Sequence, residues 1–172
     1  MESLLLIPVG CSGSGKSYLE KELRNHFENF VNVEPDDLRR KLWGDVNEQK
    51  NGHVIFRIAK EQIDKAAKEN KLIYFNATNV SYTRNEKMIP EGINILYIFM
   101  MDSLDFDLCL NRVISDISTG KDRSRVPADV IQKQCINFKN CMKDVKANGI
   151  NFVEYKGKIK QLISKIEEIM NG

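Results

Sequence analysis

The sequence lacks the features that would indicate a membrane protein, a disulfide-stabilised domain or a transition-metal centre. None of its apolar runs reaches the roughly 20 residues that a membrane-spanning helix needs. Its four cysteines form no C-x-x-C pair, and its two histidines are isolated. We therefore expect free, mostly buried thiols and no metal held by cysteine or histidine. The first residues lack the positive start of a signal peptide, so the sequence predicts a cytoplasmic protein without a membrane partner.

An excess of charge of one sign is also missing. The 26 Lys and Arg residues nearly balance the 24 Asp and Glu residues, and the net charge of +2 does not by itself indicate a nucleic-acid partner. The 172 residues, 42% of them hydrophobic, suffice for one domain with a real core. Since no repeat, linker or low-complexity tract interrupts the chain, we expect a single domain over residues 1–172.

The sequence does contain a phosphate-binding loop with the pattern G-x-x-x-x-G-K-[ST]. It consists of Gly10, Cys11, Ser12, Gly13, Ser14, Gly15, Lys16 and Ser17. An apolar segment at 3–9 precedes the loop, and apolar residues at helical spacing follow it over 16–28. A strand, a glycine-rich turn and a helix N-terminus surround an anion with backbone N–H groups. This context predicts that the whole loop binds the phosphates of a nucleoside triphosphate.

The residues of the loop have separable roles. Gly10, Gly13 and Gly15 permit backbone angles and close approaches that a Cβ atom would block. Lys16 can reach the β- and γ-phosphates, and the Ser17 hydroxyl can ligate Mg²⁺. The predicted cofactors are therefore ATP and Mg²⁺.

Strands and helices are expected to alternate along the chain. The predicted strands cover 3–9, 30–34, 71–76, 93–101 and 151–155. The predicted helices cover 16–28, 36–42, 52–69, 82–88, 103–117, 127–147 and 157–170. This alternation predicts an α/β fold of the P-loop NTPase type, in which a parallel sheet of four to five strands lies between two helical layers. Ligands in such folds bind beyond the carboxyl ends of the strands, so the residues that follow each strand are candidate site residues.

An acidic turn follows the second predicted strand. Pro35 ends the strand, and Asp36 and Asp37 open a short helix. A carboxylate there can accept a proton from an attacking hydroxyl, and Arg39 can bind a phosphate or carboxylate of the acceptor. Helix capping explains one of the acids equally well, so both interpretations stay open from spacing alone.

Polar residues also follow the third and fourth predicted strands. Asn76-Ala77-Thr78-Asn79, with Arg84 further on, would face the nucleotide edge of the sheet, although a turn and a helix cap explain the same pattern. Asp102 has the position of an acid that could hold Mg²⁺ through water.

A basic segment at 112–127 contains Arg112, Arg123 and Arg125. It suits a lid that closes over the triphosphate, with arginines that stabilise charge on the transferred phosphoryl group. An ordinary solvated loop has a similar composition, but three arginines near a triphosphate site favour the lid.

Together these elements resemble the kinase module of phage and bacterial 5′-hydroxyl polynucleotide kinases, from the first strand to about residue 147. The resemblance implies transfer of the ATP γ-phosphate to the 5′-hydroxyl end of RNA or DNA in a bacterial or phage-infected cell. It implies that Asp36 is the general base and that Arg39 holds the phosphate adjoining the acceptor nucleotide. Lys16 would act in catalysis beside them. The other implied site residues are Arg125 as a further catalytic group; Arg112, Arg123 and Arg125 on the ATP phosphates; and Thr78, Asn79 and Arg84 on the substrate. Any phosphatase or ligase partner would be a separate protein.

The chain departs from the family pattern at Asn76, where the family usually has Asp. An amide supplies no negative charge to a magnesium shell or to Arg39. Two other functions therefore stay open: a kinase of a small metabolite or sugar nucleotide, and a weakly active ATP-binding regulatory module. A small GTPase is disfavoured because the guanine-binding Asn-Lys-x-Asp is absent from the sequence. A ring-forming mechanical ATPase is disfavoured because no predicted strand ends in Asp-Glu.

Overall fold

The computed structural model of the chain describes residues 2–172. Its strands are β1 (Leu4–Val9), β2 (Phe30–Val33), β3 (Leu72–Phe75), β4 (Asn94–Met100) and β5 (Phe152–Tyr155). Its helices are α1 (Lys16–His26), α2 (Pro35–Trp43), α3 (Gly52–Lys68), α4 (Tyr82–Glu86), η1 (Met101–Leu104, a 3₁₀ turn), α5 (Phe106–Ser118), α6 (Ala128–Ala147) and α7 (Ile159–Asn171). The predicted strands and helices are thus confirmed, with ends that shift by a few residues.

The helix predicted over 103–117 needs a correction. Residues 101–104 form the separate turn η1, and α5 begins only at Phe106. The cause is local, because the Asp105 carboxylate accepts a hydrogen bond from the Leu108 N–H (3.0 Å) and so caps the new helix.

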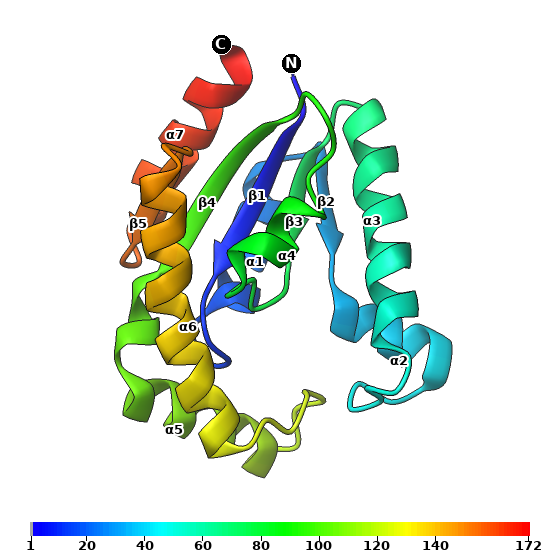
Figure 1. Cartoon of the computed structure of the whole chain (residues 1–172), viewed down its shortest axis with the longest axis vertical. Helices are drawn as coiled ribbons and strands as arrows, with labels where there is room; N and C mark the ends of the chain where they lie inside the picture. The colour runs from blue at the N-terminus through cyan, green and yellow to red at the C-terminus, as the bar shows by residue number, and fades with distance from the viewer. Residues whose placement is uncertain (1) are drawn as a thin grey trace.

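The five strands form one parallel sheet in the order β2-β3-β1-β4-β5. The predicted fold class is confirmed. Every connection crosses over through at least one helix, so all five carboxyl ends lie along the same edge of the sheet (Figure 1). β1 lies at the centre, and the phosphate-binding loop leaves its carboxyl end.

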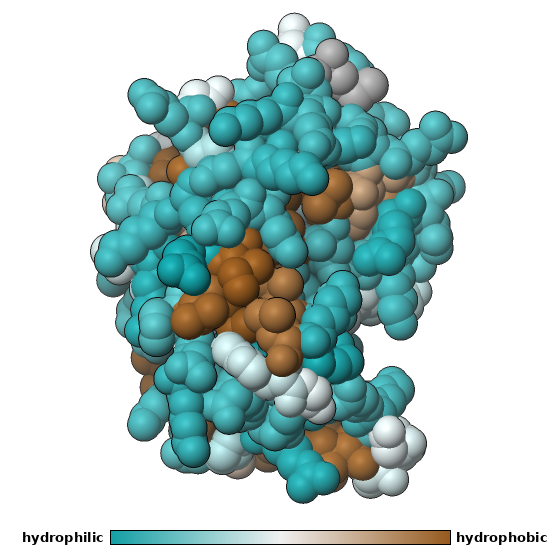
Figure 2. All heavy atoms as spheres, turned by 90° about the vertical axis from the view of Figure 1, so that its right-hand side faces the viewer, coloured by the Kyte–Doolittle hydropathy of each residue, from teal (hydrophilic) through white to brown (hydrophobic). Residues whose placement is uncertain are grey.

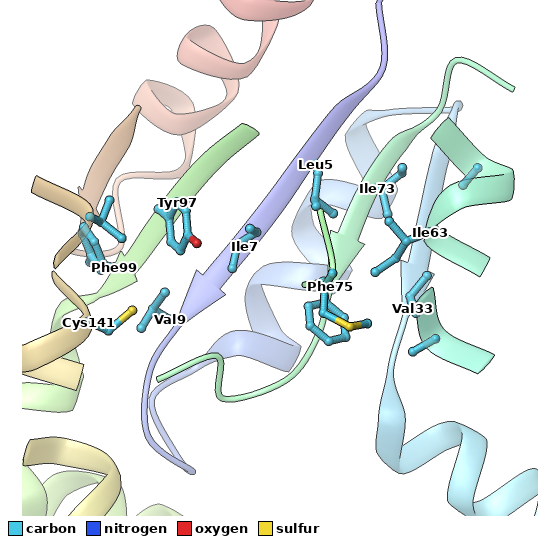
Figure 3. Packing of buried hydrophobic residues seen from close by; sticks show 14 of the residues in the cluster. Leu5, Ile7, Val9, Val33, Ile63, Ile73, Phe75, Tyr97, Phe99 and Cys141 are labelled. Atoms are coloured by element: carbon cyan, nitrogen blue, oxygen red, sulfur yellow. The ribbon is translucent and has the colours of Figure 1, made fainter. Parts of the chain in front are cut away.

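Both faces of the sheet are covered by helices, because the strands are apolar on both sides. Leu5, Ile7 and Val9 of β1 pack toward α3 and α6, together with Phe75 and Tyr97 (Figure 3). The alternate residues face a second cluster that includes helices α1 and α7. Its fully buried members are Leu4, Leu6, Leu19, Leu23, Leu72, Tyr74, Leu96, Ile98 and Ile166. The chain therefore has a three-layer α/β/α architecture.

All four cysteines are free and buried, as predicted. The side of the molecule shown in Figure 2 is mostly hydrophilic, with separate apolar areas. Among residues 2–172, no helix combines the length and the apolar character that crossing a membrane requires.

Candidate active site

The phosphate-binding loop has a backbone that only glycine adopts without strain at two positions. Gly13 and Gly15 have φ angles of 82° and 97°. Gly15 is also the N-cap of α1 and has no side chain with which to cap it. The first-turn N–H groups of α1 therefore point into the loop, where an anion can accept their hydrogen bonds.

Other elements hold the loop in this shape. A Cβ atom built on Gly13 would lie 2.3 Å from the backbone carbonyl oxygen of Cys109, so the loop packs directly on α5. Three side chains hydrogen-bond to the backbone of residues 11–13: Ser103 Oγ accepts from the Cys11 N–H (3.1 Å), Gln134 Oε1 accepts from the Ser12 N–H (2.9 Å), and Arg112 Nη1 donates to the Gly13 carbonyl (3.1 Å). The Gly10 N–H also donates to the Thr78 carbonyl (3.0 Å), and the Tyr74 hydroxyl donates to the Lys16 carbonyl (2.8 Å). The loop is thus preorganised by η1, α5 and α6.

Lys16 folds back over the loop. Its Nζ donates to the carbonyl oxygens of Gly10 (2.9 Å) and Cys11 (2.8 Å). Burial lowers the pKa of the Lys16 ammonium to about 8, an effect that negative charge on the nearby Cys11 sulfur partly opposes. A bound phosphate would give this ammonium the anionic partner that the two neutral carbonyls do not provide.

The lowered pKa of Lys16 predicts proton uptake when ATP binds. Phosphate oxygens stabilise the ammonium form, so binding should raise the pKa of Lys16 back toward its usual 10.5. Between about pH 8 and pH 10, Lys16 is largely deprotonated in the free protein and protonated in the ATP complex. ATP affinity should therefore fall as pH rises through this range. Calorimetry in buffers of different ionisation enthalpy should show this uptake in the wild type and not in Lys16→Met. Equal uptake in both proteins would contradict the assignment.

A cleft of about 1100 Å³ lies between the loop, α2, the end of β3 and the segment that joins α5 to α6. It brings together most of the predicted site residues. Those that line it are Ser12, Gly13, Gly15, Lys16, Ser17, Asp36, Arg39, Thr78, Arg112, Arg123 and Arg125. Glu34, Asn47, Asp116 and Gln134 also line it and were not predicted. Only Glu34 carries a sequence signal, since it follows a strand directly.

Asp36 and Arg39 form an ion pair inside this cleft. Arg39 Nη1 donates to Asp36 Oδ1 at 2.7 Å, and the Arg39 side chain is only 9% exposed. The N-cap of α2 is Glu34, without a side-chain cap hydrogen bond, so Asp36 does not cap the helix. Within the described chain, the buried Nε of Arg39 has no hydrogen-bond partner. A buried unpaired donor is costly, and an anion in the cleft would satisfy it.

Two predicted substrate residues lie elsewhere. The Asn79 side chain is buried and donates to the carbonyl oxygens of Pro8 (2.9 Å) and Phe75 (2.8 Å), so it joins the ends of β1 and β3. Its φ of 52° suits this turn, since Asn tolerates the left-handed region. Arg84 is exposed on α4, away from the residues that line the cleft. Neither side chain lines the cleft.

The predicted lid is shorter than residues 112–127. α5 continues to Ser118 because its apolar helical spacing continues, so the irregular segment covers 119–127 and Arg112 lies on the helix. Arg112 Nη1 pairs with Asp102 Oδ2 at 2.8 Å. Asp102 therefore holds Arg112, and it lines a separate cavity rather than the cleft around Ser17.

The segment 119–127, called the lid below, contacts both sides of the cleft. Arg123 pairs with Asp116 of α5 at 2.6 Å. Two lid contacts reach the opposite side: the Arg40 Nε of α2 donates to Asp122 Oδ2 (2.6 Å), and the Arg125 N–H donates to Asn47 Oδ1 (2.9 Å). The lid thus extends toward the α2–α3 connection, as its path in Figure 1 shows.

A smaller cavity of about 430 Å³ borders the loop where α1, β4 and β5 meet. It is lined by Ser14, Gly15, Tyr18, Met100, Asp102, Arg112, Tyr155, Lys156 and Gly157. Aromatic and apolar side chains with a charged rim suit a planar heterocycle such as a nucleobase. Its position beside the phosphate loop would allow one nucleotide to occupy both sites.

A family model described as "AAA domain" matches residues 5–91, just over half of the chain. The chain belongs to this AAA domain family. The match includes the phosphate loop, Asp36, Arg39 and Asn76 and ends before the lid. In this AAA domain, β3 and β4 are followed by Asn76 and by Met101-Asp102, not by the Asp-Glu pair of a ring-forming mechanical ATPase.

Solved structures show that this AAA domain has the P-loop kinase fold. A chain of the Pnkp1/Rnl/Hen1 RNA repair complex aligns with a TM-score of 0.72 at 20% identity, covering 83% of this chain and 46% of its own. Deoxyadenosine kinase from M. mycoides with bound dATP aligns with a TM-score of 0.58 at 13% identity, and the alignment covers 97% of this chain and 100% of the kinase. A gluconokinase from Sinorhizobium meliloti aligns with a TM-score of 0.53 at 13% identity, and the alignment covers 95% of this chain and 87% of the gluconokinase. The chain thus spans less than half of the matched repair-complex chain, and no curated protein sequence matches it.

The loop geometry fits a nucleoside triphosphate, and the exposed Ser17 hydroxyl at the cleft fits a Mg²⁺ ligand. Among residues 2–172, no group of three or more His, Cys, Asp or Glu side chains is placed to hold a metal ion.

Proposed function

We propose that this chain transfers the γ-phosphate of ATP to the 5′-hydroxyl end of a polynucleotide. The observation that carries the proposal is the concentration of cationic side chains in the cleft around Asp36. Twice as many Lys and Arg as Asp and Glu side chains line it, although the whole chain is nearly neutral. The cations are Lys16, Lys21, Arg39, Arg40, Arg112, Lys121, Arg123 and Arg125. A triphosphate donor together with an acceptor that carries its own phosphates would match this charge.

Each side chain has a distinct role in this proposal. The exposed oxygen of Asp36 accepts the proton of the 5′-hydroxyl as it attacks the γ-phosphorus atom. Arg39, whose Nε has no partner in the described chain, holds the phosphate next to the acceptor nucleotide. Lys16 binds the β- and γ-phosphates, and Arg125 stabilises charge on the transferred phosphoryl group from the lid.

Arg123 and Arg112 support the donor. The Nε of Arg123 is buried and has no hydrogen-bond partner among residues 2–172, so it is available to a phosphate oxygen. Arg112 borders both the cleft and the smaller cavity, between the expected phosphates and the nucleobase. Mg²⁺ held at Ser17 would neutralise part of the triphosphate charge.

The proposal extends to partners and location. The matched repair-complex chain is assembled with Rnl and Hen1, which supports an activity that depends on separate end-healing proteins. We place this activity in the cytoplasm, on RNA or DNA ends.

An acceptor panel tests the proposal directly. ATP labelled at the γ-position is incubated with 5′-hydroxyl RNA, 5′-hydroxyl DNA, nucleosides, gluconate and sugar nucleotides. Labelled oligonucleotide is the expected product, and a matched 5′-phosphorylated oligonucleotide serves as the unreactive control. Because the deoxyadenosine kinase and gluconokinase share this fold, label found only on nucleosides or sugars would overturn the proposal.

A further inference from the structure

Glu34 differs from the other acids of the cleft. The acids that line the cleft are Glu34, Asp36, Asp116 and Asp122. Asp36 pairs with Arg39, Asp116 pairs with Lys121 and Arg123, and Asp122 pairs with Arg40. Glu34 is the one member of this set whose carboxylate makes no ion pair within the described chain. Its partners are the amides of Asn32 (3.2 Å) and Asn76 (3.3 Å).

The backbone places Glu34 and Asn76 next to each other on one face of the sheet. Val33 of β2 is opposite Phe75 of β3, so the residues that follow them are neighbours as well. The Asn76 N–H donates to the Val33 carbonyl (2.8 Å), and Glu34 has an extended backbone, so the strand geometry continues to both residues. Their side chains consequently leave the same edge of the sheet on the same side.

That side is the one covered by α1. The Tyr74 hydroxyl donates to the Lys16 carbonyl at 2.8 Å, which places Tyr74 under the first turn of α1. Asn76 is two residues further along and therefore faces the same way. Ser17, in this first turn, lines the cleft together with Glu34 and Asn76. Ser17, the expected Mg²⁺ ligand, and Glu34, the carboxylate without an ion pair, thus lie on the same side of the cleft.

Asn76 orients the carboxylate and leaves an oxygen available. Its Nδ2 donates to Glu34 Oε2, while its Oδ1 accepts no hydrogen bond from the described residues. Asn76 lines the cleft and is only 7% exposed as a whole residue, and its Oδ1 remains available to a ligand there. Amide and carboxylate oxygens are ligands that suit Mg²⁺ and its coordinated water.

The electrostatics of Glu34 favour a cation beside it. Burial raises the pKa of Glu34, the Asn32 amide opposes this shift, and the nearby Asp36 and Asp37 carboxylates raise the pKa further. The positive charge of Arg40 lowers the pKa of Glu34, but Arg40 forms its ion pair with Asp122 and not with Glu34. A divalent ion beside Glu34 would stabilise its charged form and remove this cost.

We propose that Glu34, oriented by Asn76, supplies the carboxylate that binds the water shell of Mg²⁺ held at Ser17. The negative charge that position 76 lacks is then provided by the residue hydrogen-bonded to it. The inference rests on the ATP and Mg²⁺ part of the proposed function, and it does not depend on the acceptor.

The test compares ATP affinity in saturating Mg²⁺ with ATP affinity in EDTA, without any acceptor. The ratio of the two affinities measures what the metal contributes to binding. Loss of an outer-shell ligand typically costs 10–100-fold, so Glu34→Gln should lower the ratio by about that factor while affinity in EDTA stays near that of the wild type. Glu34→Gln combined with Asn76→Asp returns the charge to the neighbouring position and should restore most of the ratio.

Asp122→Asn is the matched control, because it removes one negative charge from the same cleft at the lid. Its ratio should stay close to the wild-type value. An unchanged ratio in Glu34→Gln, or an equal loss of affinity in Mg²⁺ and in EDTA, would overturn the proposal in favour of a purely structural carboxylate. Wild-type protein that binds ATP with metal dependence but phosphorylates no polynucleotide would instead refute only the proposed function.

Discussion

Asp36→Asn is expected to lower the rate of phosphoryl transfer by about 10²–10⁴-fold, the range that a general base contributes. The amide keeps the size of the side chain and its contact with Arg39, but it cannot accept the proton of the attacking hydroxyl. ATP binding should be retained because the phosphate loop is unaltered. Single-turnover transfer to a 5′-hydroxyl oligonucleotide and a separate ATP titration measure the two quantities.

Asp37→Asn provides a closely matched control for this effect. Asp37 is the next residue, its side chain has nearly the same exposure (39% against 40%), and it pairs with Arg40 and Lys41 but does not line the cleft. Its loss should change the transfer rate little. Equal rates for the two variants would mean that Asp36 only helps to position Arg39.

Gly13→Ala should abolish ATP binding and also destabilise the fold. The left-handed backbone at Gly13 costs a residue with a Cβ atom about 1–3 kcal/mol, and the new methyl group would meet the Cys109 carbonyl at 2.3 Å. Because the neighbour is backbone, the loop or α5 has to move. For a chain of this size each kcal/mol lowers Tm by about 2–4 °C, so thermal unfolding should show a drop of several degrees.

Gly92→Ala separates backbone strain from the clash. Gly92 has a similar φ of 73°, but an added Cβ atom there has no neighbour within 4 Å. It should show a smaller loss of Tm and full ATP binding. If Gly13→Ala bound ATP as well as Gly92→Ala does, the packing of the loop on α5 would not be required for its function.

The sequence carries the fold because its signals are local and repeated. The run from Ile93 to Met101 is apolar almost without interruption, which indicates a strand covered on both faces, and β4 is such a strand. The loop at 10–17 is likewise a contiguous pattern whose flanks are a strand and a helix. Such signals require no knowledge of distant contacts.

The remainder of the site depends on contacts between distant segments. Asn79 has the sequence position of a site residue, but its amide is used by the carbonyls of β1 and β3. Gln134 lies 122 residues from Ser12 and still fixes the loop backbone, and nothing in its local sequence indicates this. Glu34 directly follows a strand, but that its carboxylate makes no ion pair is clear only once the ion pairs of its neighbours are known. Which polar groups are already paired is a property of the tertiary structure.

We expect the two lid contacts to set how often the cleft opens. The Arg40–Asp122 pair is exposed to solvent, with side-chain exposures of 38% and 68%, and exposed pairs contribute about 0–1 kcal/mol. The hydrogen bond between the Arg125 N–H and Asn47 adds about 1 kcal/mol. A sum of about 1–2 kcal/mol corresponds to an open population of roughly 3–15% at equilibrium. Such a population would permit exchange of substrates without unfolding of any helix, because neither contact is part of a helix's own hydrogen bonding.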